Sequence, residues 1–296
     1  MRAGSDNMRG ALLMTGSMAA FTFGDTCMKA IGDSLPLSQS LTLRAIFSTT
    51  FLAILAHRRG ALHMRFPTRD RALVLLRAMA EAGAALFFFT ALFNMPFANV
   101  SALLQMLPLT LALGSALFFG EAVGWRRWSA IIAGFVGMLL IVRPGTEGFN
   151  IYALSALGAV VCATIRDLAT RRMSTAVPSL AATFATSATV LVMAAGWSLF
   201  QDWQPLSAEN GALLLGAGTF IIVAYALSVA TMRVGEVGFV APFRYTSLVL
   251  ALAIGWLVFD EWPAVLSLIG AAIIMGTGLF TLWREQRRPR LPVKPH

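Results

Sequence analysis

Charged side chains inside long apolar segments are the residues of this sequence that could do chemistry. Eight ionisable groups interrupt such segments, namely Asp25, Lys29, Arg44, Arg77, Glu81, Arg166, Asp167 and Arg244. A charge that loses its water is costly unless another group pairs with it, so charges in apolar segments usually mark a function. Groups of both signs indicate either structural ion pairs or a site for a charged ligand.

Two of the charged pairs share a spacing and recur along the chain. Asp25 and Lys29 are four residues apart, as are Asp167 and Arg171, so each pair lies on one face of a helix and can form an ion pair. The interval from Asp25 to Asp167 therefore equals that from Lys29 to Arg171. We interpret the pairs as candidate gates or charge relays, one near each mouth of a membrane domain. The alternative is that both are interfacial ion pairs that fix helix ends.

Three further charges are candidates for a ligand site. Arg77 and Glu81 are also four residues apart, so they are expected to face a neighbouring helix or a wet cavity. Arg44 has no charged partner on its own helix. It could bind Glu81, backbone carbonyls or a carboxylate of the ligand.

Polar residues beside two prolines complete the candidate site. Gln105 and Tyr245 lie on two separate segments that also contain Pro108 and Pro242, respectively. A proline within a helix frees a carbonyl and kinks the helix, which suits the wall of a cavity. The alternatives are an interhelical hydrogen bond for Gln105 and an interfacial aromatic role for Tyr245. The predicted ligand-binding set is Arg44, Arg77, Glu81, Gln105, Tyr225, Arg244 and Tyr245.

Other kinds of site are disfavoured by the residue types. Cys27 and Cys162 lie in apolar segments without metal-ligand spacing, and His57, His63 and His296 fall in predicted loops or the tail. We therefore expect no metal and no cofactor. The sequence also lacks the Gly-x-Ser-x-Gly and His-Glu-x-x-His motifs, which disfavours an intramembrane enzyme. A receptor would need a partner, because no segment is long enough for a soluble output domain.

The elements that must position these residues are membrane-spanning helices. Of the 296 residues, 57% are hydrophobic and 12% charged, and the mean hydropathy is +0.73, so an apolar solvent is indicated. A spanning helix needs about 20 mostly apolar residues. The sequence predicts spans at 9–31, 37–57, 70–93, 97–119, 125–143, 150–172, 178–201, 208–232, 237–259 and 263–284.

Basic residues predict the orientation of these spans, because Lys and Arg are enriched in cytoplasmic loops. If the N-terminus is cytoplasmic, only Arg143 falls in an outer loop. Both termini are then cytoplasmic, which requires an even number of spans and supports ten. The inner regions hold Arg2, Arg9, Arg58, Arg59, Arg65, Arg69, Arg71, Arg126, Arg127, Arg171, Arg172, Arg233, Arg284, Arg287, Arg288, Arg290 and Lys294.

The two halves of the chain resemble each other. The interval from Phe119-Gly120-Glu121 to Phe259-Asp260-Glu261 equals that from Gln105 to Tyr245, and each triplet ends an apolar span. We predict one five-helix repeat over 1–146, a second over 147–287 and a basic tail over 288–296. Because five is odd, the second repeat enters the membrane from the opposite side, as in many secondary transporters. The predicted fold class is an all-α integral membrane protein of ten transmembrane helices in two inverted repeats.

The region from Arg77 to Val142 resembles the drug/metabolite transporter (DMT) superfamily, of the EamA type, and 242–276 echoes it. The residues that carry the resemblance are Phe88-Phe89-Thr90-Ala91-Leu92, Met95-Pro96-Phe97-Ala98, Leu107-Pro108-Leu109, Phe119-Gly120-Glu121, Trp125-Arg126-Arg127-Trp128, Gly134 and Gly137. The resemblance implies ten helices in two inverted repeats. It also implies a central cavity lined mainly by the third, fourth, eighth and ninth helices, with parts of the first and sixth. The charged set of Arg44, Glu81 and Arg244 departs from the common pattern.

The resemblance also implies a function and a location. The chain is similar to bacterial exporters or exchangers of amino acids and related metabolites, which sit in the inner membrane. We expect a monomer whose partners are the bilayer and a zwitterionic amino acid. Arg44 and Arg244 would attract its carboxylate, and Glu81 or Arg77 its amino group or counter-charge. Uptake of a nucleoside-like or other metabolite is the alternative, since these residues do not fix the direction.

Overall fold

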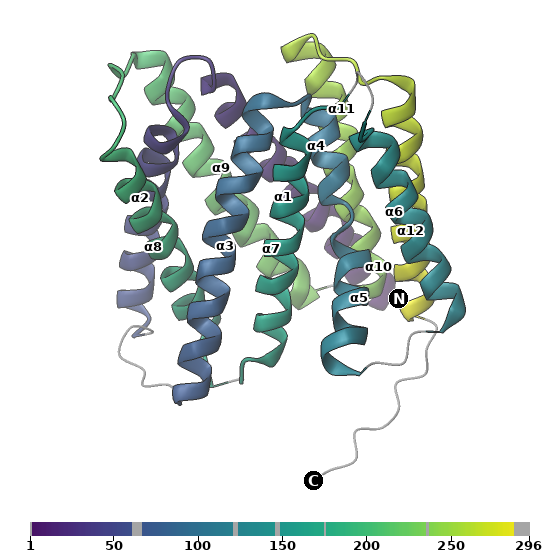
Figure 1. Ribbon diagram of the computed structural model, residues 1–296. Helices are drawn as coiled ribbons and strands as arrows, with labels where there is room; N and C mark the ends of the chain where they lie inside the picture. Colours follow the sequence, from purple (N-terminus) through teal and green to yellow (C-terminus); the bar gives the residue numbers. More distant parts are fainter. Residues whose placement is uncertain are drawn as a thin grey trace.

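The protein is all-helical over the residues that its computed structural model describes, which are 2–60, 67–120, 124–145, 149–174, 176–234 and 237–286 (Figure 1). Every predicted span corresponds to a helix or an interrupted helix, so the prediction of ten helical segments is confirmed. The elements are α1 Arg2–Ile31, α2 Leu37–Arg58, α3 Thr68–Asn94, α4 Phe97–Leu104, α5 Leu107–Phe119, α6 Trp125–Val142, α7 Tyr152–Arg172, α8 Ser179–Ser198, α9 Ala208–Val234, α10 Val237–Val240, the 3₁₀ helix η2 Ala241–Tyr245, α11 Thr246–Phe259 and α12 Val265–Gln286.

Most of these helices are suited to a bilayer. By length and hydropathy, eight helical segments among the described residues could cross a membrane, and Trp128–Val142 is a shorter apolar helix. The eight segments include 97–119 and 241–259, each an interrupted span. The chain is therefore a multi-pass membrane protein, as its composition predicted. The basic tail over 288–296 and Glu121 lie outside the described residues.

Proline and left-handed residues set several helix boundaries. Pro36 and Pro178 directly precede α2 and α8, where a missing backbone N–H costs nothing. Helix α6 ends at Val142 because Arg143 adopts a φ of 50°, in the left-handed region, and Pro144 follows. These local signals explain why hydropathy and proline positions located most helix ends to within a few residues.

Two of the ten spans are interrupted, and both interruptions lie beside a proline. The fourth span breaks between α4 and α5, at Gln105 and Met106, and Pro108 sits in the first turn of α5. The ninth span passes from α10 through η2, which contains Pro242, into α11. Proline lacks an N–H donor and clashes with the preceding turn, so regular α-helix does not continue through it. Both spans therefore depart from regular α-helix inside the bundle.

Contacts between helices join the two halves of the chain. The most extensive packing is between α1 and α9, α3 and α7, α2 and α8, and α6 and α12. In Figure 1, α6 and α12 lie together at the right edge, and α2 and α8 lie together at the left edge. Most of the packing therefore connects residues that are distant in sequence.

The α6–α12 contact depends on two facing glycines, which gives a stability prediction. A Cβ on Gly270 would lie 2.8 Å from Ile141 and even closer to the Gly137 carbonyl oxygen. We expect Gly270→Val to lower the free energy of unfolding by about 1–3 kcal/mol, because the helices must separate. Thermal unfolding in detergent measures this loss. Gly276→Val on the same helix is the control, since a Cβ there meets no atom within 4 Å; equal stability of the two variants would contradict the prediction.

Candidate functional site

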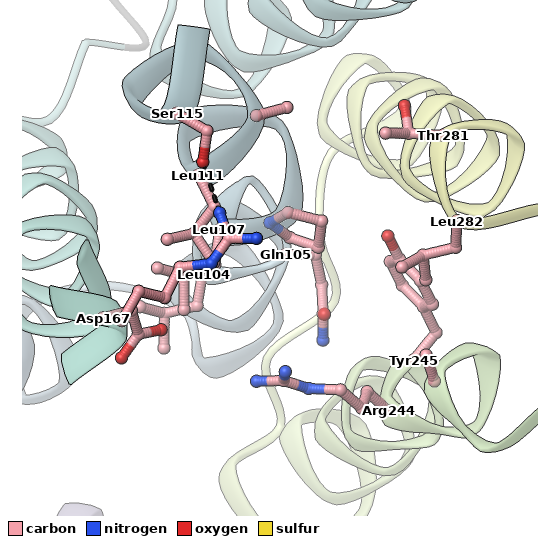
Figure 2. Close-up of a pocket in the computed structure, with 14 residues that line it drawn as sticks. Leu104, Gln105, Leu107, Leu111, Ser115, Asp167, Arg244, Tyr245, Thr281 and Leu282 are labelled. Carbon is pink, nitrogen blue, oxygen red and sulfur yellow. Dashed lines mark hydrogen bonds between the residues drawn. The ribbon is translucent and has the colours of Figure 1, made fainter. Parts of the chain in front are cut away.

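A cavity of about 410 Å³ lies where the two interrupted spans meet (Figure 2). Its walls come from α4, α5, the end of α7, η2 and α12. Apolar side chains make up most of the lining. The polar and proline residues that line it are Gln105, Pro108, Ser115, Asp167, Arg171, Arg244, Tyr245 and Thr281.

The helix interruptions hold the polar side chains in this cavity. Gln105 lies at the break between α4 and α5, and Arg244 and Tyr245 lie in η2. The Gln105 amide donates to the hydroxyl of Ser247 at 2.8 Å, which joins the fourth span to the ninth. Figure 2 shows the exposed Arg244 guanidinium extending into the cavity on the side of Gln105. A cation and an amide therefore face the same cavity.

Tyr245 occupies the opposite wall of the same cavity. Its side chain turns toward α12, beside Leu282 (Figure 2). Only 4% of the residue is exposed, and its hydroxyl has no hydrogen-bond partner among the described residues. The ring fits there because α12 carries Gly278, where any Cβ would collide with the Tyr245 hydroxyl. Tyr245 is therefore packed inside the protein, which does not match the interfacial alternative.

An ion-pair network lies next to the cavity. Arg166 binds Glu81 of α3 at 2.7 Å and Asp167, its neighbour in α7, also at 2.7 Å. The three side chains are only 24%, 19% and 30% exposed, respectively. Asp167 also lines the cavity and interacts electrostatically with Arg244. The network therefore connects the cavity wall to α3.

Arg44 lies at the other end of this network. Its guanidinium stacks over the ring of Phe89, 4.5 Å from the ring centre. Asp25 of α1, Tyr225 of α9 and Glu81 of α3 act on its charge from three other helices. Tyr225 is 43% exposed and makes an edge-to-face contact with Phe21. The structure thus gathers charges from α1, α2, α3 and α7 that the sequence could place only on separate helices.

Arg77 stands apart from the cavity. It donates to Thr170 of α7 at 3.0 Å, to the Ala182 carbonyl of α8 at 3.2 Å, and to Thr186. Glu81, four residues along α3, turns instead to Arg166. The spacing of Arg77 and Glu81 therefore does not make them partners, because each finds a nearer group on another helix.

The predicted Asp25–Lys29 pair does not form. Lys29 binds Glu261 at 2.9 Å and donates to the carbonyls of Leu92 and Met95 at 3.1 and 2.8 Å. Glu261 in turn accepts a hydrogen bond from the Phe97 backbone N–H at 2.8 Å. Lys29 lies near the end of α1, beside the carbonyls that end α3, so it has acceptors nearer than Asp25. We call Lys29, Glu261 and the backbone groups that they bind the outer latch.

The second predicted pair is also arranged differently. Asp167 accepts a hydrogen bond from Arg166, and Arg171 donates to the Ser115 hydroxyl. Arg171 and Asp167 nevertheless line the same cavity. This cavity lies toward the ends of α5 and α7, whereas the outer latch lies at the ends of α1 and α3, on the opposite side.

Four interacting residues, Arg166, Glu261, Ser247 and Ser115, are not among the site residues that the sequence predicts. Arg166 was identified as an intramembrane charge but given no role, because adjacent residues on a helix are not expected to share a face. Its side chain reaches both acids because it is long. Ser247 and Ser115 carry no sequence signal that separates them from other hydroxyl residues. Their roles depend on the neighbouring helix alone.

Comparison with known proteins gives matches over nearly the whole chain. The model of the EamA-like transporter family matches residues 8–143 and again 150–283. A riboflavin transporter of Vibrio cholerae is 27% identical over 96% of both chains. A riboflavin transporter of Rhizobium johnstonii is 33% identical over 83% of this chain and 80% of its own. The pseudopaline exporter CntI of Pseudomonas aeruginosa is 27% identical over 87% of this chain and 91% of its own.

A similarity to a solved structure extends to the fold. One protein of known crystal structure is 20% identical and superposes with a TM-score of 0.59, covering 94% of this chain and 99% of its own. At this level of identity the similarity shows a common fold and carries no statement about substrate.

Proposed function

The chain belongs to the EamA-like transporter family of the DMT superfamily, and from this premise we propose that it carries a small metabolite across the bacterial inner membrane by alternating access. It is a transporter rather than an enzyme. The observation that carries the proposal is the cavity between the two interrupted spans. Discontinuous helices near the middle of the membrane are a common site for substrates in secondary transporters.

Two inverted five-helix repeats, over 1–146 and 147–287, are part of this proposal. The helix packing supports them. In this arrangement α1, α2, α3 and α6 correspond to α7, α8, α9 and α12. Helix α1 packs on α9, and its counterpart α7 packs on α3, while α2 packs on α8 and α6 on α12. A two-fold relation between the repeats predicts this exchange of contacts. Gly16 and Gly158, which are separated by the same interval as Asp25 and Asp167, likewise face α9 and α3, respectively. Each repeat also has one interrupted span.

The orientation proposed here has both termini in the cytoplasm, on the basis of the basic residues counted above. The 410 Å³ cavity then lies toward the cytoplasmic side, and the outer latch closes the opposite side. The two repeats share one chain, so a monomer has both halves that rocking requires. The net direction of transport follows the driving gradient. A cargo that is concentrated in the cell would move outward, as in the exporter CntI. The alternative is uptake coupled to another gradient.

The first candidate cargo is an amino acid or a related zwitterion. Arg244 would bind its carboxylate and Asp167 would face its amino group, because both side chains line the cavity. Arg44 lies beside the network and would receive the carboxylate as the repeats rock. Charged hydrogen bonds of this kind orient a small ligand strongly.

The second candidate cargo is riboflavin, which two specific observations favour. Two relatives are riboflavin transporters, and their similarity extends over most of the chain. The cavity volume of about 410 Å³ is in the range of sites for drug-sized organic molecules, and its lining combines apolar side chains with polar groups that could orient such a ligand. Gln105 and Arg244 would donate to the ring carbonyls of such a ligand.

Counterflow in liposomes tests the proposal and separates the two cargoes. Purified protein is reconstituted in vesicles loaded with one unlabelled compound, and entry of the same labelled compound is followed. The panel contains amino acids, riboflavin and other metabolites. Entry above that of empty vesicles identifies the cargo. If no compound in a broad panel enters faster than in empty vesicles, the proposed function is wrong.

Arg244 gives the prediction for the binding site. We expect Arg244→Ala to reduce counterflow of the cargo about 10–100-fold, because a hydrogen bond to a charged group contributes about 1.5–3 kcal/mol. The initial rate over a range of cargo concentrations measures the loss. The control is Arg126→Ala, which removes an exposed arginine that stacks on Trp125 away from the cavity. Wild-type rates in Arg244→Ala would place the cargo elsewhere.

A further inference from the structure

Asp25 differs from the other acidic side chains at membrane depth. Glu81 and Asp167 both bind Arg166. Asp25 forms no ion pair or hydrogen bond with any described residue. The two neighbouring hydroxyls on α1 do not help, since Thr22 and Thr26 donate to the carbonyls of Met18 and Thr22. A half-buried carboxyl group is thus left without a direct partner.

Arg44 is the cation that acts most on Asp25 in the described part of the chain. Arg44 of α2 acts on it, but its guanidinium stacks over Phe89 and forms no ion pair with the carboxylate. Arg44 also interacts with Tyr225 of α9 and with Glu81 of α3. Arg44 therefore interacts with two acids, Asp25 and Glu81, and forms an ion pair with neither in the described structure.

The remaining charged and titratable groups around α1 are otherwise engaged. Lys29 is held by Glu261 in the outer latch. Arg244 of η2 interacts with Asp167. Cys27, two residues after Asp25 on α1, is a neutral thiol at ordinary pH. Helices α10 and α11, which pack on α1, carry no charged residue. Asp25 therefore has Arg44 as its main electrostatic influence.

The chemistry of such a group favours reversible protonation. Loss of water favours the neutral carboxylic acid, whereas a nearby cation favours the carboxylate. When the two effects oppose each other and no hydrogen bond fixes either form, a small change in surroundings moves the proton on or off. Rocking of the repeats would change the exposure of Asp25 to water in this way.

We propose that Asp25 is the proton-binding site that couples transport to the proton gradient, through Arg44. The proposal rests on the proposed transport function. With Asp25 ionised, Arg44 is attracted to it. A proton that binds the carboxylate cancels this attraction, and Arg44 is then available for Glu81 or for an anionic group of the cargo. Proton and cargo therefore bind together and move in the same direction. Where the proton gradient points into the cell, this coupling drives uptake, the alternative direction given above.

Transport under an imposed pH gradient tests the coupling. Vesicles with the wild-type chain should accumulate the counterflow cargo above its external concentration when the outside is acidic, and lose this accumulation when a protonophore is added. Asp25→Asn, which resembles the protonated form, should lose the accumulation and exchange cargo at a rate that no longer depends on pH. Asp33→Asn, on the exposed turn after α1, is the matched control and should accumulate like the wild type.

The outcomes separate this inference from the proposed function. Counterflow without a response to the gradient would leave the transporter intact and overturn the coupling. Gradient-driven accumulation by Asp25→Asn at the wild-type level would also overturn the role of Asp25. An infrared titration of the purified chain needs no cargo. The wild-type spectrum minus that of Asp25→Asn, recorded at each pH, isolates the carboxylic acid band of Asp25, and the absence of a band in this difference on acidification would overturn the assignment.

Discussion

Arg166→Met is expected to abolish transport and to lower the free energy of unfolding by about 3–5 kcal/mol, which is the usual cost of removing one partner from a buried ion pair. The reason is that Glu81 and Asp167 would both remain in the bundle as charges without a cation at 2.7 Å. Thermal unfolding in detergent measures the loss of stability, and counterflow measures the loss of transport.

A triple variant separates the charge effect from the effect of shape. Adding Glu81→Gln and Asp167→Asn to Arg166→Met removes the stranded charges. We expect this variant to regain most of the stability, because the desolvation cost of two carboxylates disappears. It should not regain transport, since the cavity wall has lost its acid. A single Arg166→Met variant as stable as the wild type would show that the network is not structural.

Lys29→Met is expected to open the side of the molecule that the outer latch closes. The ammonium group binds a carboxylate and two carbonyls, and charged hydrogen bonds contribute about 1.5–3 kcal/mol each. Their loss should shift the equilibrium toward the open form by at least about tenfold. A cysteine at Ala251, which is fully buried in the apolar cluster that contains Met28 and Phe97, reports the change in a chain without Cys27 and Cys162.

The measurement is the rate at which a membrane-impermeant thiol reagent labels this cysteine in intact cells. We expect labelling to be slow with the latch present and at least about tenfold faster with Lys29→Met. A cysteine at Leu199, which is 83% exposed, should react equally in both backgrounds. Equal labelling of the Ala251 position in both backgrounds would contradict a gating role for Lys29.

Variants of Arg166, Asp25 and Arg244 are expected to change transport and proton coupling in different ways, so comparing them separates the two. Loss of Arg166 removes the ion pair between α3 and α7 and leaves Glu81 and Asp167 without their cation, so every mode of transport should stop. Loss of Asp25 should remove only the response to the proton gradient. Loss of Arg244 should reduce the affinity for cargo while the response to the gradient remains. One reconstituted system therefore distinguishes structure, coupling and binding.

The membrane class, the ten helical segments and most of their ends follow from the amino-acid sequence. Hydropathy and proline act within a single segment, so no knowledge of the partner helices is needed. The prediction of α2, for example, differs from the structure by one residue at its end. The family resemblance was likewise a property of local motifs, and the family match over both halves confirms it.

Which charged side chains pair with each other depends on how the helices pack, and the sequence did not show it. A spacing of four residues shows that two side chains share a helix face, and it does not identify the nearest opposite charge. Lys29 therefore binds Glu261, which lies in the other half of the chain, and Arg166 binds Glu81. In an apolar medium a charge takes the best partner within reach, and that partner is set by how the helices of the two halves pack.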